Sequence, residues 1–233
     1  MEKQSESGST TGDPRDRVID ATLALAAKQG WSSFGLHDIA EAAQVSLAVL
    51  RSLFPSKGAV LGAMMRRTDL VVLQGTQADL DDEPVRERLF DVLMRRFDAL
   101  APYKDGLRAV MAAVKRDPVF ALALHGPASN SMRYMLEAAG IGTSGPLGHL
   151  RVQGAVVLFA RVMDVWLQDE DQDLARTMAR LDRELDQAGR VIGRVEGVMR
   201  ATAPLRAACR RVGEGARARR RAMRDADPAS AAG

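Results

Sequence analysis

The chain is poor in several residue types, and each scarcity removes a class of protein. Only one residue is a cysteine, Cys209, which excludes an internal disulfide and agrees with a cytoplasmic location. Aromatic residues make up 4% of the chain, too few for the stacking platforms that bind single-stranded nucleic acids. No apolar run reaches the length of a membrane-spanning helix, and the polar start MEKQSESGSTTGD lacks the apolar core of a signal peptide. We therefore expect a cytoplasmic protein.

Patterns of catalytic and metal-binding residues are also missing. The three histidines are far apart in the sequence, and there is no Cys-x-x-Cys, His-Glu-x-x-His or phosphate-binding glycine loop. The acidic run DEDQD at 169–173 lacks the glycine and the terminal glutamate of a calcium loop. It stands where the start of a helix favours negative charge, so we interpret it as a helix cap. The sequence thus predicts no enzyme, with no catalytic residue, no metal and no cofactor.

The charge of the chain is small and unevenly distributed. The net charge is +3, but the segment from residue 201 onward contains eight arginines against three carboxylates. A solvated basic tail is the commonest interpretation of such a segment. Residues 1–13 are small and polar, with little to bury, and we expect them to be disordered.

Apolar residues at helical spacing indicate helices along most of the remaining sequence. A first helix is expected from Pro14 to the residue before Gly30, because proline suits a first helical position and glycine a helix end. Short helices follow at about 36–43 and 47–53, and Ser56 is expected to cap a long helix.

The second half of the chain shows the same helical spacing and no convincing strand pattern. Pro84 marks the start of another helix, Pro118 follows a further one, and the segment 140–148 is the clearest internal loop. The sequence therefore predicts an all-α fold.

One apolar series near the carboxyl end repeats every 3.5 residues, as in helices that pack lengthwise against a partner helix. Its members are Leu174, Met178, Leu181, Leu185, Ala188, Ile192, Val195 and Met199. Periodicity alone favours equally a dimer interface and a core face within the chain.

Five short motifs in the first 60 residues form a series: Gly30-Trp31, Ile39-Ala40, Ala43, Val45-Ser46 and Phe54-Pro55-Ser56-Lys57. With these motifs the segment resembles the DNA-binding domain of TetR-type transcriptional regulators. In that family the first helix ends in glycine and an aromatic residue. A helix, a turn, a recognition helix and a Phe-Pro-x-Lys junction to a long helix follow.

The resemblance implies a three-helix helix-turn-helix domain at 14–57, a larger helical ligand-binding and dimerisation domain at 58–200, and the basic tail at 201–233. The residues expected to contact DNA, with Lys57 matching a phosphate-contacting position of the family, are His37, Ser46, Leu47, Arg51, Ser52 and Lys57. The side chains expected around an apolar effector are Met94, Phe97, Leu107, Met111 and Trp166. The homodimer interface is expected at Leu174, Met178, Leu181, Leu185 and Ile192.

The sequence departs from the family where DNA should be contacted. Gly35 stands in place of a common threonine and Gln44 in place of the usual turn glycine. In the recognition helix, Leu47, Ala48 and Arg51 replace a frequent lysine, glycine and tyrosine. Residues 13–57 carry no net charge, so their non-specific affinity for DNA phosphates should be weak.

The segment 150–185 is also similar to a group of ubiquinone-biosynthesis accessory proteins, which have a TetR-like fold and hold an isoprenoid lipid. Both have an arginine before an apolar helix, a Trp-Leu-x-Asp corner and a threonine in the last helix. The Tyr-Thr-Lys-Arg motif of that group is absent except for Arg151. Under this alternative the protein would bind lipid, and its basic end would lie on an anionic membrane surface.

The retained turn Val45-Ser46, Lys57 and the 3.5-residue repeat favour the regulator over the lipid-binding module. The function predicted from the sequence is that of a homodimeric repressor. It would bind a double-stranded DNA operator and leave it when a small apolar effector or lipid binds.

Overall fold

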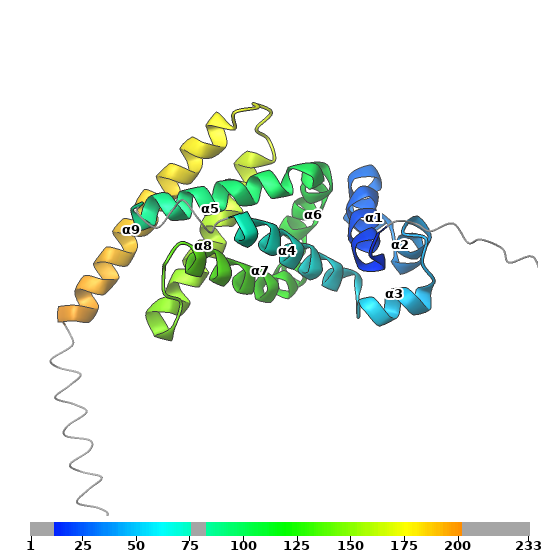
Figure 1. Ribbon diagram of the computed structural model, residues 1–233, viewed down its shortest axis with the longest axis horizontal. Coiled ribbons are helices and arrows are strands. Elements are labelled where there is room, and N and C mark those ends of the chain that lie inside the picture. The colour runs from blue at the N-terminus through cyan, green and yellow to red at the C-terminus, as the bar shows by residue number, and fades with distance from the viewer. Residues whose placement is uncertain (1–11, 76–82, 202–233) are drawn as a thin grey trace, which may run out of the picture. The chain divides into compact units, whose positions relative to one another are not determined.

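The computed structural model describes residues 12–75 and 83–201, and these are helices joined by short loops, without strands (Figure 1). The predicted all-α fold is confirmed. The elements are α1 (Pro14–Gln29), the 3-10 turn η1 (Trp31–Ser33), α2 (Leu36–Ala42), α3 (Leu47–Leu53), α4 (Lys57–Gly75), α5 (Val85–Leu100), the 3-10 turn η2 (Ala101–Tyr103), α6 (Lys104–Arg116), α7 (Pro118–Ala138), α8 (Gly145–Trp166) and α9 (Ala175–Ala201).

By its internal contacts the chain divides into two compact units, one ending at Leu185 and the other beginning at Asp186. The division falls inside α9 and does not coincide with the predicted domain boundaries, which stay predictions. The predicted disorder up to residue 11 and the basic tail after residue 201 lie outside the described residues. Among the helices described, none is both long and apolar enough to cross a membrane.

The helix ends predicted from capping residues agree with the structure. The Asp13 carboxylate accepts a hydrogen bond from the Arg15 backbone N–H at 2.9 Å, and Gly30 ends α1 with a φ of 84°. The Ser56 hydroxyl oxygen accepts from the Ala59 N–H at 3.3 Å at the start of α4. The predicted loop at 140–148 is too long, because α8 already begins at Gly145 with a proline in its first turn.

The first three helices enclose a small apolar core and lie side by side in Figure 1. Val18 and Ile19 of α1, Ile39 of α2 and Leu50 of α3 are at most 2% exposed. Phe54 closes this core just before α4 leads into the remaining helices. The short helices α2 and α3 therefore owe their stability to packing within this three-helix group, since isolated helices of this length are not stable in water.

A close contact between α1 and α6 joins this three-helix group to the rest of the unit. It requires a glycine at position 106, since a Cβ there would lie 2.5 Å from the Leu23 carbonyl oxygen. Real Cβ atoms do not approach an oxygen so closely, and both partners lie on regular helix backbone. Any other residue at this position would force α1 and α6 apart.

Substitution Gly106→Ala is expected to lower the free energy of unfolding by about 1–3 kcal/mol, the usual cost of overpacking. The matched control is Gly189→Ala in α9, where a Cβ would meet nothing within 4 Å. The control should be neutral or stabilise by up to about 1 kcal/mol, because alanine favours helix. Urea unfolding followed by circular dichroism at one protein concentration measures both. Equal stability of the two variants would contradict the proposed role of Gly106.

A buried ion pair lies among α4, α5 and α7. The Arg96 guanidinium of α5 donates to the Asp69 carboxylate of α4, which also accepts from the Ser131 hydroxyl of α7 at 2.7 Å. The three residues are 3%, 6% and 2% exposed. Burial lowers the pKa of the Arg96 guanidinium, and the charge of Asp69 opposes this lowering. The pair fixes α4, the helix that leads out of the three-helix group.

Candidate nucleic-acid interface

The turn between α2 and α3 has the tight geometry of a helix-turn-helix. The Val45 N–H donates to the Ala40 carbonyl oxygen at 2.9 Å across the turn. Gln44 adopts a φ of 54°, the left-handed conformation that glycine accepts without strain and other residues rarely take. The turn thus has a left-handed residue at its centre although that residue is not glycine.

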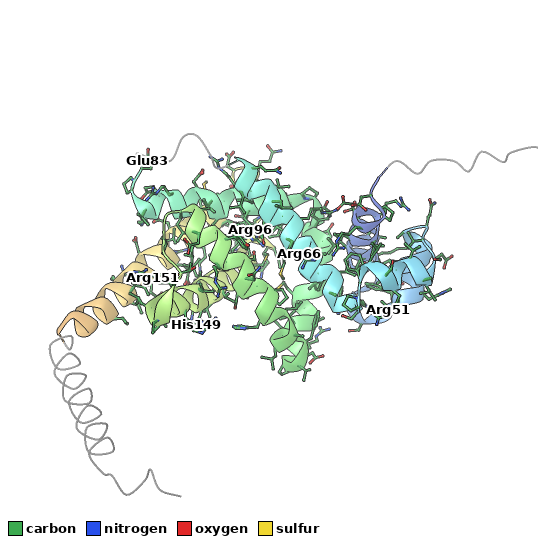
Figure 2. The ribbon with its side chains drawn as sticks, turned by 60° about the horizontal axis from the view of Figure 1, so that its bottom comes forward. Arg51, Arg66, Glu83, Arg96, His149 and Arg151 are labelled. Carbon is green, nitrogen blue, oxygen red and sulfur yellow. The ribbon has the colours of Figure 1, made fainter. Side chains whose placement is uncertain are left out.

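Helix α3 has one buried face and one exposed face. Leu50 points into the three-helix core and is 2% exposed, whereas Leu47 and Val49 are 50% and 40% exposed. Arg51 and Ser52 are exposed as well, and Figure 2 shows Arg51 at the surface of this helix. A recognition helix needs such an exposed face, since it must enter a groove of the duplex.

The small polar side chains of this region are engaged with the backbone of α3. The Ser46 hydroxyl oxygen caps the helix by accepting from the Val49 N–H at 3.2 Å. The Ser52 hydroxyl donates to the Val49 carbonyl oxygen at 2.8 Å. The Ser46 hydroxyl keeps its own proton for donation, whereas the Ser52 hydroxyl would have to leave the Val49 carbonyl oxygen to donate to DNA. His37, in the first turn of α2, is exposed.

Lys57, predicted to contact a phosphate, is hydrogen-bonded within the three-helix group. Its ammonium group donates to the carbonyl oxygens of Trp31 and, at 2.7 Å, of Phe34. It also lies 3.5 Å from the centre of the Phe34 ring and 4.3 Å from that of Trp31. Burial lowers the pKa of this lysine, partly offset by the charge of Asp38. Lys57 therefore joins η1 to α4, and its contact with a DNA phosphate stays a prediction.

Other cations of the three-helix group are also occupied. The Arg17 guanidinium donates to the Ala43 carbonyl oxygen at 3.2 Å and so holds α1 against the end of α2. The Arg15 guanidinium lies 4.7 Å from the centre of the Phe54 ring. Arg51 is the single charged residue in the sequence of α3 and stands exposed. Few charges are thus directed toward phosphates, in agreement with the zero net charge of residues 13–57.

Three of the five residues predicted to surround an effector lie in the core. Phe97 is fully buried, Trp166 is 1% and Leu107 is 8% exposed. The Phe97 ring centre lies 4.9 Å from that of Phe159, stacked, and 5.4 Å from that of Trp166. These side chains pack against one another in the described structure, so their role as effector contacts stays a prediction.

Met94 and Met111 are half-buried. A cleft lies beside η1, and neither methionine lines it. This cleft has a volume of about 530 Å³ and lies between η1, the start of α4, α6 and the start of α7. Trp31 and Phe120 stack at 5.4 Å on its wall. Sequence reasoning missed it, because its wall joins segments far apart in the chain.

The predicted dimer residues are divided between core and surface. Leu181 and Leu185 are 0% and 6% exposed and pack inside the unit that ends at Leu185, so their assignment to a dimer interface is corrected. Leu174 and Met178 are half-buried in the same unit, and Ile192 is half-buried in the second unit. For these three the interface role stays a prediction.

The acidic run before α9 acts as the predicted helix cap. The Asp169 carboxylate accepts from the backbone N–H of Thr177 at 2.8 Å and from its hydroxyl at 2.7 Å. Burial by itself would raise the pKa of Asp169, but these hydrogen bonds outweigh it and the pKa lies below its ordinary value. The Trp-Leu-x-Asp corner, which suggested a lipid-binding module, thus serves the core through Trp166 and the helix cap through Asp169.

The structure has a three-helix group with an exposed α3, followed by a larger helical body. This arrangement is that of a helix-turn-helix protein. Residues 18–64 match the family model of the bacterial regulatory proteins of the tetR family. The amino-terminal part of this chain is therefore similar to the helix-turn-helix domain of that family. The matched family consists of regulatory proteins and not of enzymes, in agreement with the prediction from the sequence.

Individual proteins that are similar to this chain are consistent with the match to this family. The HTH-type transcriptional repressor KstR of Rhodococcus jostii (strain RHA1) is 42% identical over 53 residues, which span 23% of this chain and 25% of that protein. A TetR transcriptional regulator from Nitrosomonas europaea has the same fold with a TM-score of 0.60 at 23% identity, over 76% of this chain and 99% of that one. The fatty acid degradation regulator FadR from Bacillus halodurans has a TM-score of 0.52 at 20% identity, over 75% and 95%.

Proposed function

We propose that this protein is a transcriptional repressor that binds a double-stranded DNA operator through α3 and leaves it when a small apolar effector binds. The observation that carries the proposal is the exposed face of α3 behind a tight turn, with Leu50 anchoring the helix and Arg51 outside. α3 is a seven-residue helix, and the side chains on its outer face are exposed. Entry into the major groove gives this exposed face a partner.

The proposed homodimer would use the exposed face of α8. Leu150 and Val157, seven residues apart and so on one side of the helix, are 43% and 50% exposed. Between them a Cβ at Gly154 would meet nothing within 4 Å, which leaves room for a second helix to approach closely. A dimer would present two copies of α3 to successive half-sites on the duplex.

The apolar character of the proposed effector rests on the side chains around Phe97 and Trp166. Two half-buried methionines, Met94 and Met111, belong to the predicted effector set, and methionine side chains repack easily around an apolar ligand. One structural neighbour is by its description a regulator of fatty acid degradation. We therefore place fatty acids first among the effectors to be tested.

The central test is the affinity for fluorescently labelled DNA from the region upstream of the protein's own gene, measured by anisotropy at low salt. Wild type should bind in preference to a scrambled duplex. Arg51→Ala should weaken binding by about 1–3 kcal/mol, because it removes one base or phosphate contact from each α3. The control is Arg133→Ala, an exposed arginine of α7, which should bind as wild type does.

Two outcomes count against the proposal. Equal affinity of wild type for the upstream and scrambled duplexes would refute specific operator binding. Full affinity of Arg51→Ala would remove α3 as the reading element. Adding fatty acids of increasing chain length to the complex should release the DNA, and an unchanged anisotropy throughout would contradict effector control by this ligand class.

A further inference from the structure

The exposed face of α3 is unusually apolar for a helix that reads DNA. Its first three residues are Leu47, Ala48 and Val49, all exposed and all without a side-chain hydrogen-bonding group. The neighbouring Ser52 hydroxyl donates its proton to the Val49 carbonyl oxygen at 2.8 Å, and the Ser46 hydroxyl, which accepts from the Val49 N–H at 3.2 Å, keeps a single donor. Hydrogen bonds to base edges, the usual basis of sequence recognition, are therefore scarce at this surface.

The beginning of a recognition helix is the part that meets the bases. In helix-turn-helix proteins the amino-terminal residues of the second helix contact base edges in the major groove. In α3 these are Leu47 and Ala48, and Leu47 lies one turn before Arg51 on the same side of the helix. A side of α3 that includes Leu47 would thus face the floor of the groove.

The major groove offers one apolar group to such residues. Adenine, guanine and cytosine present hydrogen-bond donors and acceptors there, whereas thymine adds its C5-methyl group. An exposed leucine that packs against polar base edges would displace their bound water and form no hydrogen bond in its place. Placed against a methyl group, the same leucine buries apolar surface on both sides and is stabilised.

We infer that this protein reads its operator through thymine methyl groups that pack against Leu47, with Arg51 supplying the polar contact one turn later. The inference rests on the proposed function, because it names the base chemistry that the proposed DNA-binding surface recognises. It predicts half-sites with a T·A pair opposite the first turn of α3. The preference of the protein for one DNA sequence over another then depends mainly on the apolar area buried between Leu47 and thymine. It depends only slightly on hydrogen bonds between side chains and base edges.

The test compares two versions of the upstream duplex, one made with thymidine and the other with deoxyuridine, which lacks only the C5-methyl group. Wild type should bind the uracil duplex about fourfold more weakly for each methyl group that Leu47 no longer meets, and on the order of tenfold more weakly for the two half-sites of a dimer. Synthetic duplexes with single replacements then locate the thymines responsible.

A variant separates contact by Leu47 from a general effect of uracil on duplex shape. Leu47→Ala should bind the thymine duplex about as weakly as wild type binds the uracil duplex, and should distinguish the two little. The matched control is Val119→Ala, which truncates a side chain on α7 that is 76% exposed and should keep the full difference. Leu47 is exposed, so its replacement leaves the core intact, and circular dichroism checks this.

The outcomes distinguish the inference from the function on which it rests. Specific binding with equal affinity for the thymine and uracil duplexes would overturn methyl recognition and leave the repressor proposal standing. An undiminished thymine preference of Leu47→Ala would assign the effect to duplex shape and overturn the inference too. Absence of specific binding to either duplex would overturn both.

Discussion

Replacing Asp69 by alanine is expected to lower the free energy of unfolding by about 3–5 kcal/mol, a large part of the stability of a typical domain. The destabilisation arises because the variant leaves the Arg96 guanidinium buried without its counter-ion. Arg96 is 3% exposed, so water cannot replace the carboxylate. The Ser131 hydroxyl is deprived of its acceptor at the same time. Urea unfolding at fixed protein concentration measures the change.

A surface ion pair provides the control for this prediction. Arg108 and Asp105 form an i,i+3 pair at 2.5 Å with side chains 50% and 75% exposed. Asp105→Ala should therefore cost at most about 1 kcal/mol, as solvent screens such pairs. The double variant Asp69→Leu with Arg96→Met should regain much of the stability, because both charges are removed together.

The same variants, measured by DNA anisotropy, show whether the buried pair also affects DNA binding. The pair joins α4 to α5 and α7, and α4 continues from the three-helix group that holds α3.

If Asp69→Ala unfolds at the same urea concentration as Asp105→Ala, the pair contributes no more than a surface contact and the stability prediction is wrong.

Replacing Trp166 by alanine should cost about 3–5 kcal/mol, the range for truncating a large buried aromatic side chain. Trp166 is 1% exposed, and its ring centre lies 5.4 Å from that of Phe97. The Lys104 ammonium lies 5.1 Å from the Trp166 ring centre, so the variant also removes a cation–π interaction between α6 and α8. Thermal unfolding without any added effector measures the effect.

The control for Trp166 is Leu122→Ala on α7, where the side chain is 74% exposed and truncation should change the stability by no more than about 0.5 kcal/mol. A residue that only lines an effector site would, when truncated, change ligand binding more than stability. A Trp166→Ala variant as stable as Leu122→Ala would therefore return this residue to the predicted effector site.

Local signals in the sequence predicted the helices well. Proline at first helical positions, glycine at 30 and serine at 56 mark helix ends in the structure where they were expected. These residues act on their immediate neighbours through fixed φ angles or short hydrogen bonds, so position in the sequence is sufficient to interpret them. The loop at 140–148 was misjudged, because its glycines and proline fit a helix start as well as a turn.

The candidate site was predicted less completely. Arg51 and Leu47 are exposed as a recognition helix requires, and helical periodicity with Leu50 inside could indicate this. Lys57 could not be assigned in this way. Its ammonium group meets the carbonyl oxygens of Trp31 and Phe34, which are more than twenty residues earlier in the chain.

The 3.5-residue repeat illustrates the same limit. It identified an apolar face on α9 correctly, yet gave equal support to packing within the chain and between chains. The structure places Leu181 and Leu185 in the chain's own core. Periodicity reports which side of a helix avoids water, and the partner that covers that side is a property of the folded arrangement.

The sequence by itself determined the all-α class, the positions of most helix ends and the tight turn before α3, because each depends on residues close together in the chain. Tertiary structure alone decided that Lys57 is held by carbonyl oxygens, that Asp69 and Arg96 meet, and that Trp166 lies in the core. These contacts join residues between 23 and 69 positions apart. Their formation depends on how helices pack, which the local pattern of residues does not specify.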